Sequence, residues 1–201
     1  MRIFLDRITR DLSRLEMAFA VILISGLIWV IFQRSVVLLA HAERAYIQAT
    51  IANLQRGLTM TMLEMILTKN YERIASLDGA NPFEQAASSH RTAFDTAYAS
   101  AVPAEEKITY EAPERYLGVL TDPDLTALQK GRWYFDGDNK ELVYLVEYDR
   151  YFDAPGQPPP ARIRFKARLQ FHDINGNGKF DLTDKPSTMT LKSLNEYKWS
   201  F

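Results

Sequence analysis

The sequence predicts an α+β protein in which one long N-terminal helix packs on a small antiparallel β-sheet. The first observation is a helical pattern: no proline occurs between residues 15 and 81, and apolar residues recur at steps of three and four up to about residue 75. The second is a change of period near residue 131, after which apolar and polar residues alternate as in strands. The first half of the helix is apolar all round and the second half is amphipathic, so the two halves belong in different surroundings.

The composition restricts the classes of function. The chain has 201 residues, a net charge of −1, three histidines and no cysteine. Without a basic surplus we expect no nucleic-acid partner, and without cysteine no disulfide can brace the fold. The histidines are far apart, and no P-loop, nucleophile elbow or zinc spacing occurs. We therefore expect neither an enzyme nor a small-molecule substrate.

Residues 15–40 are predicted to form a transmembrane helix. No charged residue occurs between residues 17 and 32, and about 20 apolar residues are enough to cross a bilayer as a helix. Arg34 is tolerable near one end, because its long stem can carry the guanidinium to the headgroups. Glu16 stands at the other end, where a carboxylate is either an interfacial acid or a functional group.

Residues 1–14 form a basic arm or leader that sets the orientation of this helix. Their arginines predict a cytoplasmic N-terminus, a single pass through the inner membrane, and a C-terminal domain that is periplasmic or extracellular. A cleaved signal peptide is the alternative, since residues 40–42 (Ala-His-Ala) resemble a cleavage site. The apolar stretch is longer than a usual signal-peptide core and Arg34 interrupts its end, so a retained anchor is favoured.

Residues 41–76 are predicted to continue the same helix as an amphipathic segment. Polar residues fall largely off one apolar stripe, and Gly57 alone weakens the helical run. We expect one helix from about residue 12 to about residue 75, roughly 90 Å long, ending near Asp78-Gly79. The stripe consists of Ile47, Ile51, Leu54, Leu58, Met62, Met65 and Ile66.

Residues 77–201 are predicted to form an extracytoplasmic α+β domain. The strand at 162–171 has the clearest alternation, with apolar side chains on one face and positive ones on the other. That positive face is either a solvated outer surface or a cationic patch for a partner. The other expected elements are a helix at 83–98, a connection at 99–113, an apolar run at 116–120, strands at 132–135 and 142–148 around a turn at 136–139, and a proline-rich linker at 153–160.

Residues 173–184 carry the motif with the most specific chemistry. Oxygen-bearing side chains occupy loop positions 1, 3, 5, 9 and 12, and a glycine occupies position 6, which is the calcium-loop pattern of EF-hands. The alternative is a polar Asn-Gly turn between strands. A strand precedes the loop and Pro186 discourages a following helix, so a bound Ca²⁺ would stabilise the fold in place of disulfides. The predicted ligands are Asp173, Asn175, Asn177, Lys179 through its carbonyl, Asp181 and Asp184.

Several short runs carry a resemblance to a known family. They are 15–27 (LEMAFAVILISGL), Asn81-Pro82, 116–118 (YLG), 131–136 (GRWYFD) and 142–144 (LVY). Together with the order of helix and sheet, they resemble the type IV pilin and type II secretion pseudopilin family. The resemblance implies a structural subunit of a pilus or pseudopilus that assembles with other pilin or pseudopilin subunits through its N-terminal helix. It also implies that Glu16 is the family's assembly acid, which pairs with the free amine of a neighbouring subunit.

The sequence departs from the family pattern around the processing site. Asp11 stands where the family has a glycine, and Arg14 lies inside what should be an apolar start. We therefore expect the arm to be retained or cut inefficiently. The missing paired cysteines favour a pseudopilin or minor pilin. The alternative function is a single-pass, membrane-anchored, extracytoplasmic calcium-binding or sensor domain that does not polymerise.

Overall fold

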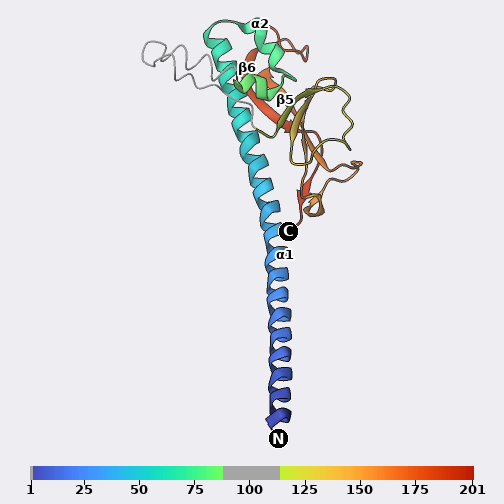
Figure 1. Ribbon diagram of the computed structural model, residues 1–201. Helices are drawn as coiled ribbons and strands as arrows, with labels where there is room; N and C mark the ends of the chain where they lie inside the picture. The colour runs from blue at the N-terminus through green and yellow to red at the C-terminus, as the bar shows by residue number, and fades with distance from the viewer. Residues whose placement is uncertain (1, 88–113) are drawn as a thin grey trace, which may run out of the picture. The chain divides into compact units, whose positions relative to one another are not determined.

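The structure is a computed structural model, and it describes residues 2–87 and 114–201 of the chain. Helix α1 spans Arg2–Leu67 as one uninterrupted coil (Figure 1). The chain divides into two compact units, Met1–Ala42 with Phe201 and Glu43–Ser200. The α+β class predicted from the sequence is confirmed, because a small five-stranded sheet follows the helix.

The first unit contains the apolar part of α1. An 18-residue window in this part reaches a mean hydropathy of 2.1, and none of it is buried. Large apolar side chains such as Phe19, Ile24 and Trp29 are exposed on it. One helix near the N-terminus is therefore long and apolar enough to cross a membrane, by length and composition.

The second unit begins with the amphipathic part of α1, and its apolar stripe is confirmed. The stripe residues Ile47, Leu54, Leu58 and Met62 are buried in the main core, and Ile51, Met65 and Ile66 pack at its edge. A helix that places apolar residues every three or four positions presents one such face to its neighbour. This part of α1 therefore belongs to the fold of the second unit.

The long helix ends earlier than predicted, at Leu67 rather than near residue 75. Lys69 takes a left-handed conformation (φ 57°), and the Asn70 N–H donates to the Met65 carbonyl at 2.8 Å. Helices often end with such a left-handed residue, but it is usually glycine or asparagine, so a lysine gave no signal in the sequence. Helical turns resume as α2 (Tyr71–Ile74) and η1 (Ala75–Leu77) and stop before Gly79, as expected.

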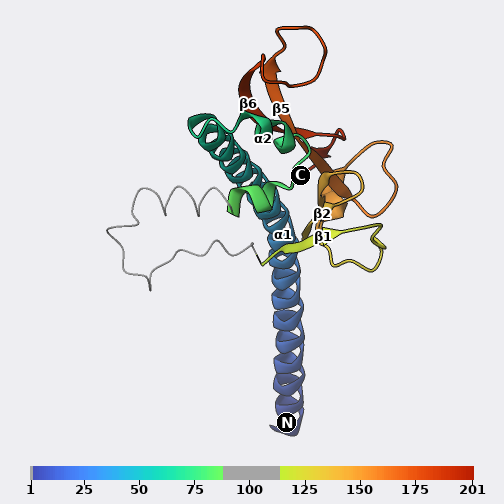
Figure 2. The ribbon, with the colours of Figure 1, turned by 90° about the horizontal axis from the view of Figure 1, so that it is seen from above.

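The main sheet has five strands in the order β1-β2-β3-β5-β6. Both views show β5 and β6 side by side (Figures 1 and 2). A separate two-stranded sheet pairs β4 with β7. The strands are β1 (Tyr116–Leu120), β2 (Trp133–Asp136), β3 (Glu141–Leu145), β4 (Phe152–Asp153), β5 (Arg162–His172), β6 (Lys185–Ser193) and β7 (Lys198–Trp199).

The prediction of a purely antiparallel sheet is wrong at one edge, because β1 runs parallel to β2. The chain between them crosses back, so that Tyr116 pairs with Trp133 and Leu120 with Asp136. Parallel neighbours need such a long connection, whereas a hairpin would make them antiparallel. Leu125 and Leu128 of this connection pack against Tyr134 and its buried neighbours on the outer face of the sheet.

The inner face of the sheet packs on the stripe of α1. Alternate residues of each strand join the same core, among them Trp133, Tyr144, Ile163 and Phe165. The alternation predicted for β5 is confirmed, with Arg162 and Arg164 on the outer face. The predicted positive face is not merely solvated, because the Arg164 guanidinium donates to both carboxylate oxygens of Glu141, at 2.7 and 3.0 Å.

The predicted helix at 83–98 is described only in part. Residues 82–87 are helical, and the rest of that helix and the connection at 99–113 lie outside the described residues. The strand predicted at 142–148 ends at Leu145. Beyond it, the N–H groups of Glu147 and Tyr148 donate to the side chain of Glu43 instead of to a neighbouring strand.

Candidate metal centre

Loop 173–184 joins neighbouring antiparallel strands, since His172 at the end of β5 pairs with Lys185 at the start of β6. No helix follows the loop, as predicted, because Pro186 already belongs to β6. All of the predicted metal ligands therefore lie on one hairpin connection.

The carboxylate of Asp173 is the centre of the first turn. Its Oδ1 accepts the N–H of Gly176 and its Oδ2 accepts the N–H of Gly178, both at 2.7 Å. Both glycines are left-handed, with φ of 74° and 71°, and a side chain at either position would be strained. The spacing of the glycines thus lets the backbone turn around the Asp173 carboxylate.

The Asp181 carboxylate forms hydrogen bonds with both asparagines of the loop. Its Oδ2 accepts the side-chain amides of Asn175 and Asn177 at 2.6 and 2.9 Å. Its Oδ1 accepts the hydroxyl and the N–H of Thr183 at 2.6 and 2.8 Å. The Thr183 hydroxyl in particular, with the other donors, lowers the pKa of Asp181 to about 2. The side chain is therefore an anion at any physiological pH.

Asp184 is buried at the end of the loop, with 7% of its surface exposed. Its Oδ1 accepts the Ile174 N–H and its Oδ2 accepts the Asp181 N–H, both at 2.9 Å. Lys179 is held through its own N–H, which donates to the Asn177 Oδ1 at 2.7 Å. Through its two hydrogen bonds, Asp184 joins Ile174 at the beginning of the loop to Asp181 near its end.

The donor types in the loop fit a hard cation, because carboxylate, amide and carbonyl oxygens are the ligands that Ca²⁺ prefers. Asn175 and Asn177 meet Asp181 through their amide nitrogens, which donate to its carboxylate, while their amide oxygens accept main-chain N–H groups. Among the side chains that the structure describes, those of residues 16–32, 34–87 and 114–201, no three acidic or histidine groups are close enough to hold a metal ion. A cation here would therefore depend on amide and main-chain oxygens as well as on the aspartates.

The sequence interpretation missed Glu43, a buried glutamate of α1. Its Oε1 accepts the Tyr144 hydroxyl at 2.9 Å and the Glu147 N–H at 2.7 Å, and its Oε2 accepts the Tyr148 N–H at 3.0 Å. These bonds tie α1 to the end of β3. A signal was present, because Glu43 lies four residues before Ile47 and so falls on the apolar stripe.

Burial raises the pKa of Glu43 above its usual 4.5, although the three hydrogen bonds oppose that rise. Burial and the neighbouring Glu43 carboxylate also raise the pKa of Tyr144, so the hydroxyl stays protonated and donates. The Glu43 carboxylate therefore holds α1 to the end of β3 within the second unit, and it satisfies all three of these buried or partly buried donors.

Glu16, the predicted assembly acid, is exposed on α1 at the start of the candidate membrane span. It lies far along the chain from loop 173–184, and the two predicted sites belong to different units. The two predictions can therefore be tested separately.

No family model, curated protein or solved structure matches this chain. Its fold defines a broad class, an α+β protein with one N-terminal helix that is long and apolar enough to span a membrane.

Proposed function

We propose that this protein is a single-pass inner-membrane structural subunit that assembles through its N-terminal helix into a filament or tip complex of the pilus or pseudopilus type. The observation that carries the proposal is α1 itself. It is continuous from Arg2 to Leu67, its apolar stretch at residues 17–32 is exposed, and its last part belongs to the core of the second unit. A lone anchor needs only about 20 residues of helix.

The exposed apolar side chains of α1 must be covered in the native membrane. Lipid can cover them, and so can the equivalent helices of neighbouring subunits. An acid at the start of such a helix is costly unless it is paired, neutral or at the membrane interface. In the proposed assembly, Glu16 is paired with a neighbouring subunit. The proposed partners are the membrane and other pilin or pseudopilin subunits, identical or different.

The test of assembly is a charge-removing change at the membrane helix. Glu16→Gln is expected to leave insertion and folding intact but to abolish co-purification of partner subunits from native membranes. Glu72→Gln is the matched control, because Glu72 is an exposed glutamate in α2 of the second unit. Unchanged co-purification in Glu16→Gln would show that the acid has no role in assembly.

The second part of the proposal is that loop 173–184 binds Ca²⁺. The residues that would hold it are the side chains of Asp173, Asn175, Asn177, Asp181 and Asp184 and the carbonyl of Lys179. Bound Ca²⁺ would neutralise the aspartates and fix the connection between β5 and β6. Its function would be structural, in a chain that has no cysteine for a disulfide.

The alternative is a membrane-anchored sensor or binding domain that does not polymerise. One observation favours it: the outer face of the sheet contains a charged hollow, whose lining is not needed for the main core. A protein that stays monomeric in its native membrane while binding a ligand in this hollow would fit the alternative and contradict the proposed assembly.

A further inference from the structure

A pocket with a volume of about 380 Å³ lies within the second unit, between α1 and the segment that contains β7. Its lining comes from two segments that are far apart in the chain. The lining residues are Arg44, Ile47 and Gln48 of α1, and Tyr197, Lys198 and Trp199 around β7. The fold thus places aromatic side chains beside the part of α1 that follows the apolar stretch.

The aromatic wall of this pocket is held in place by β4. Strand β7 pairs with β4, so that Trp199 is opposite Phe152. The ring of Phe152 stacks on Tyr197, with centroids 5.7 Å apart, and meets Trp199 edge-on at 5.2 Å. Tyrosine and tryptophan have an apolar body and a polar tip, and they are enriched where a membrane meets water.

Arg44 supplies the positive charge of the pocket. It is exposed, and among the described residues its guanidinium has no hydrogen-bond or ion-pair partner. Lys198 differs, because its ammonium forms an ion pair with Asp153 at 3.2 Å. None of the lining residues is acidic. The pocket therefore attracts an anion.

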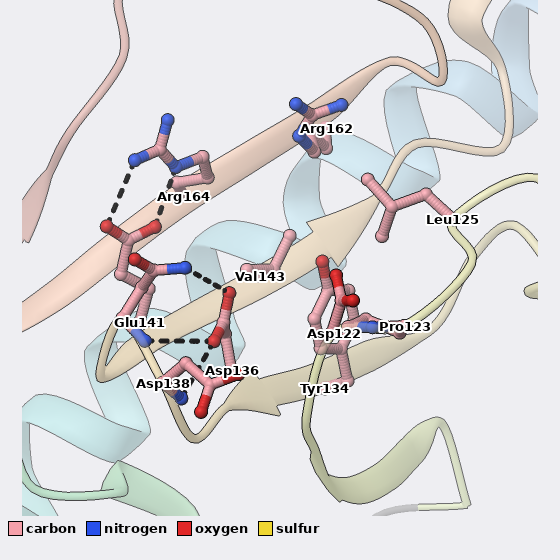
Figure 3. A pocket seen from close by; sticks show the side chains of 11 residues that line it. Asp122, Pro123, Leu125, Tyr134, Asp136, Asp138, Glu141, Val143, Arg162 and Arg164 are labelled. Atoms are coloured by element: carbon pink, nitrogen blue, oxygen red, sulfur yellow. Dashed lines mark hydrogen bonds and ion pairs between the residues drawn. The ribbon is translucent and has the colours of Figure 1, made fainter.

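The charged hollow around Tyr134, on the outer face of the sheet, offers no such cation (Figure 3). Its Arg164 donates to both carboxylate oxygens of Glu141, at 2.7 and 3.0 Å. Its Arg162 donates to main-chain carbonyls. An anion is therefore expected beside Arg44 rather than in the hollow.

The Tyr197 hydroxyl can donate to the same anion. Burial raises the pKa of Tyr197, and Arg44 is near enough to oppose that rise. The hydroxyl therefore stays protonated at neutral pH. Gln48 follows Arg44 by one helical turn, and its side-chain amide has two further N–H donors. Guanidinium, hydroxyl and amide donors suit the oxygens of a phosphate group, which arginine can bind through two parallel N–H groups.

The place of Arg44 on α1 relates the pocket to the membrane. Leu38 and Leu39 are exposed, and Arg44 follows Leu39 by five residues on the same uninterrupted helix. Five residues of helix rise about 8 Å. The headgroup layer on each side of a bilayer is about 5–8 Å thick. With α1 inserted in the membrane, Arg44 is therefore at the level of the phospholipid phosphates.

We propose that this pocket binds the headgroup phosphodiester of an anionic phospholipid. Its oxygens accept from Arg44 and the Tyr197 hydroxyl, and Trp199 lies at the boundary with the acyl chains. The inference rests on the membrane insertion that the proposed function includes, but not on the assembly of subunits. A free phosphate ion shares this chemistry, and the test separates the two sources.

The first test uses the full-length protein in nonionic detergent micelles, with dioleoyl phosphatidylglycerol as the probe and native mass spectrometry as the readout. This lipid should be retained more strongly than dioleoyl phosphatidylcholine, which has the same chains and no net charge. Equal retention of the two lipids would overturn the proposal. Binding of inorganic phosphate without a preference for phosphatidylglycerol would overturn it too, because the site would then serve a free anion.

Two variants test the assignment of residues. Arg44→Gln should weaken phosphatidylglycerol binding about fivefold, the contribution of one basic residue at an anionic membrane surface. Tyr197→Phe should weaken it about threefold, the contribution of one hydrogen bond. Arg56→Gln is the matched control, because Arg56 is exposed on the same helix and does not line the pocket. Equal binding by wild type and Arg44→Gln would contradict the proposal, as would an equal loss in Arg44→Gln and Arg56→Gln.

Trp199 reports whether the pocket reaches the headgroup layer. Trp133 is 0% exposed, so Trp29→Phe leaves Trp199 as the tryptophan of this three-tryptophan chain that a lipid can reach. In phosphatidylglycerol vesicles, a lipid with a nitroxide on its headgroup should quench the fluorescence of Trp29→Phe. Adding Trp199→Phe should remove that quenching.

Resistance to alkaline carbonate extraction measures insertion in the same vesicles. Protein that resists extraction but is not quenched would contradict this site alone. Protein that carbonate extracts would contradict the membrane insertion on which both this site and the proposed function depend.

Discussion

Glu43 is a carboxylate that three donors hold inside the fold, and its protonation is linked to stability. The folded protein raises its pKa above the usual 4.5, so the folded state holds this proton more tightly than the unfolded chain does. The stabilisation that this linkage gives is complete below about pH 4.5 and is lost as pH rises through the folded pKa. The direction is the opposite of that for Asp181, whose lowered pKa stabilises the fold above the unfolded value of 3.8.

We predict that Glu43→Gln removes this pH dependence and also destabilises the fold. A glutamine keeps one acceptor oxygen but places an NH₂ group opposite a main-chain donor, so about 1–3 kcal/mol of the free energy of unfolding should be lost. Urea unfolding of the full chain in micelles, repeated from pH 4.5 to 8, measures both effects. Glu84→Gln, at an exposed glutamate, should change neither. Parallel pH profiles for wild type and Glu43→Gln would show that Glu43 is not the linked group.

At the scale of elements, Gly57 determines how closely α1 approaches the helical residues 82–87. A Cβ at this position would lie 2.7 Å from the Ala86 Cβ and 3.0 Å from its Cα. The Thr61 hydroxyl, one turn further along, donates to the carbonyls of Gly57 and Gln85, both at 3.1 Å. Gly57 lowers the helix propensity of α1, but the close contact with Ala86 requires a residue without a side chain at this position.

We predict that Gly57→Ala destabilises the second unit, even though alanine favours a helix by about 1 kcal/mol. The steric clash should outweigh that gain and lower the melting temperature by several degrees, at about 1–3 kcal/mol for overpacking. The double variant Gly57→Ala with Ala86→Gly should recover most of the loss. Gly26→Ala is the control, because no atom lies within 4 Å of a Cβ there. A more stable Gly57→Ala protein would contradict the close packing.

We predict that Ca²⁺ binding to the loop between β5 and β6 raises the melting temperature of the protein. If Ca²⁺ binds only the folded state, a hundredfold excess of free Ca²⁺ over the dissociation constant stabilises by about 2.7 kcal/mol. The wild-type protein should therefore melt several degrees higher in millimolar Ca²⁺ than in chelator, and Mg²⁺ should restore little of the difference.

Asp173→Ala tests the loop directly, because Asp173 occupies the first ligand position. The variant also loses its bonds to Gly176 and Gly178, so only the difference between Ca²⁺ and chelator within each protein is compared. That difference should vanish in Asp173→Ala and persist in Asp153→Ala, at an exposed aspartate of β4. Identical melting of the wild type with and without chelator would make the motif a polar turn.

The features that the sequence predicted are those encoded by short-range periodicity. The stripe from Ile47 to Ile66 and the alternation along β5 each require one face to be apolar, and both are present. The candidate ligands of loop 173–184 could be named from the sequence because their spacing is local. The metal itself remains a prediction, because the hydrogen bonds of the loop are equally compatible with a turn.

The features that the sequence did not predict depend on contacts between distant residues. The parallel pairing of β1 with β2 follows from where the crossover packs, and Leu125 and Leu128 carry no sign of it in their spacing. The left-handed Lys69 likewise depends on its surroundings. The burial of Glu43 has a signal in its place on the apolar stripe, but its three donors come from residues more than 100 positions away. The hollow around Tyr134 arises from three strands and a connection that only the fold brings together.

For the whole molecule, the orientation in the membrane can be measured because the chain has no cysteine. Single cysteines can therefore be introduced without background. In intact spheroplasts, Ser187→Cys in the second unit should react with a membrane-impermeant maleimide, and Asp6→Cys in the basic arm should react only after lysis. Ser187 is exposed on β6, so burial does not limit its reaction. The reverse labelling pattern would contradict the cytoplasmic N-terminus.

Assembly through the apolar part of α1 is the central claim, and a cysteine scan of positions 22–32 in native membranes tests it most directly. Each single-cysteine protein is oxidised and analysed for cross-linked dimers and higher species, with its partner subunits present. A subunit that packs through this helix should give cross-links that recur every three or four positions, because one helical face contacts the neighbour. The same pattern should be lost when Glu16→Gln is added. Monomers at every position, with insertion into the membrane intact, would contradict the claim and leave a lone membrane anchor.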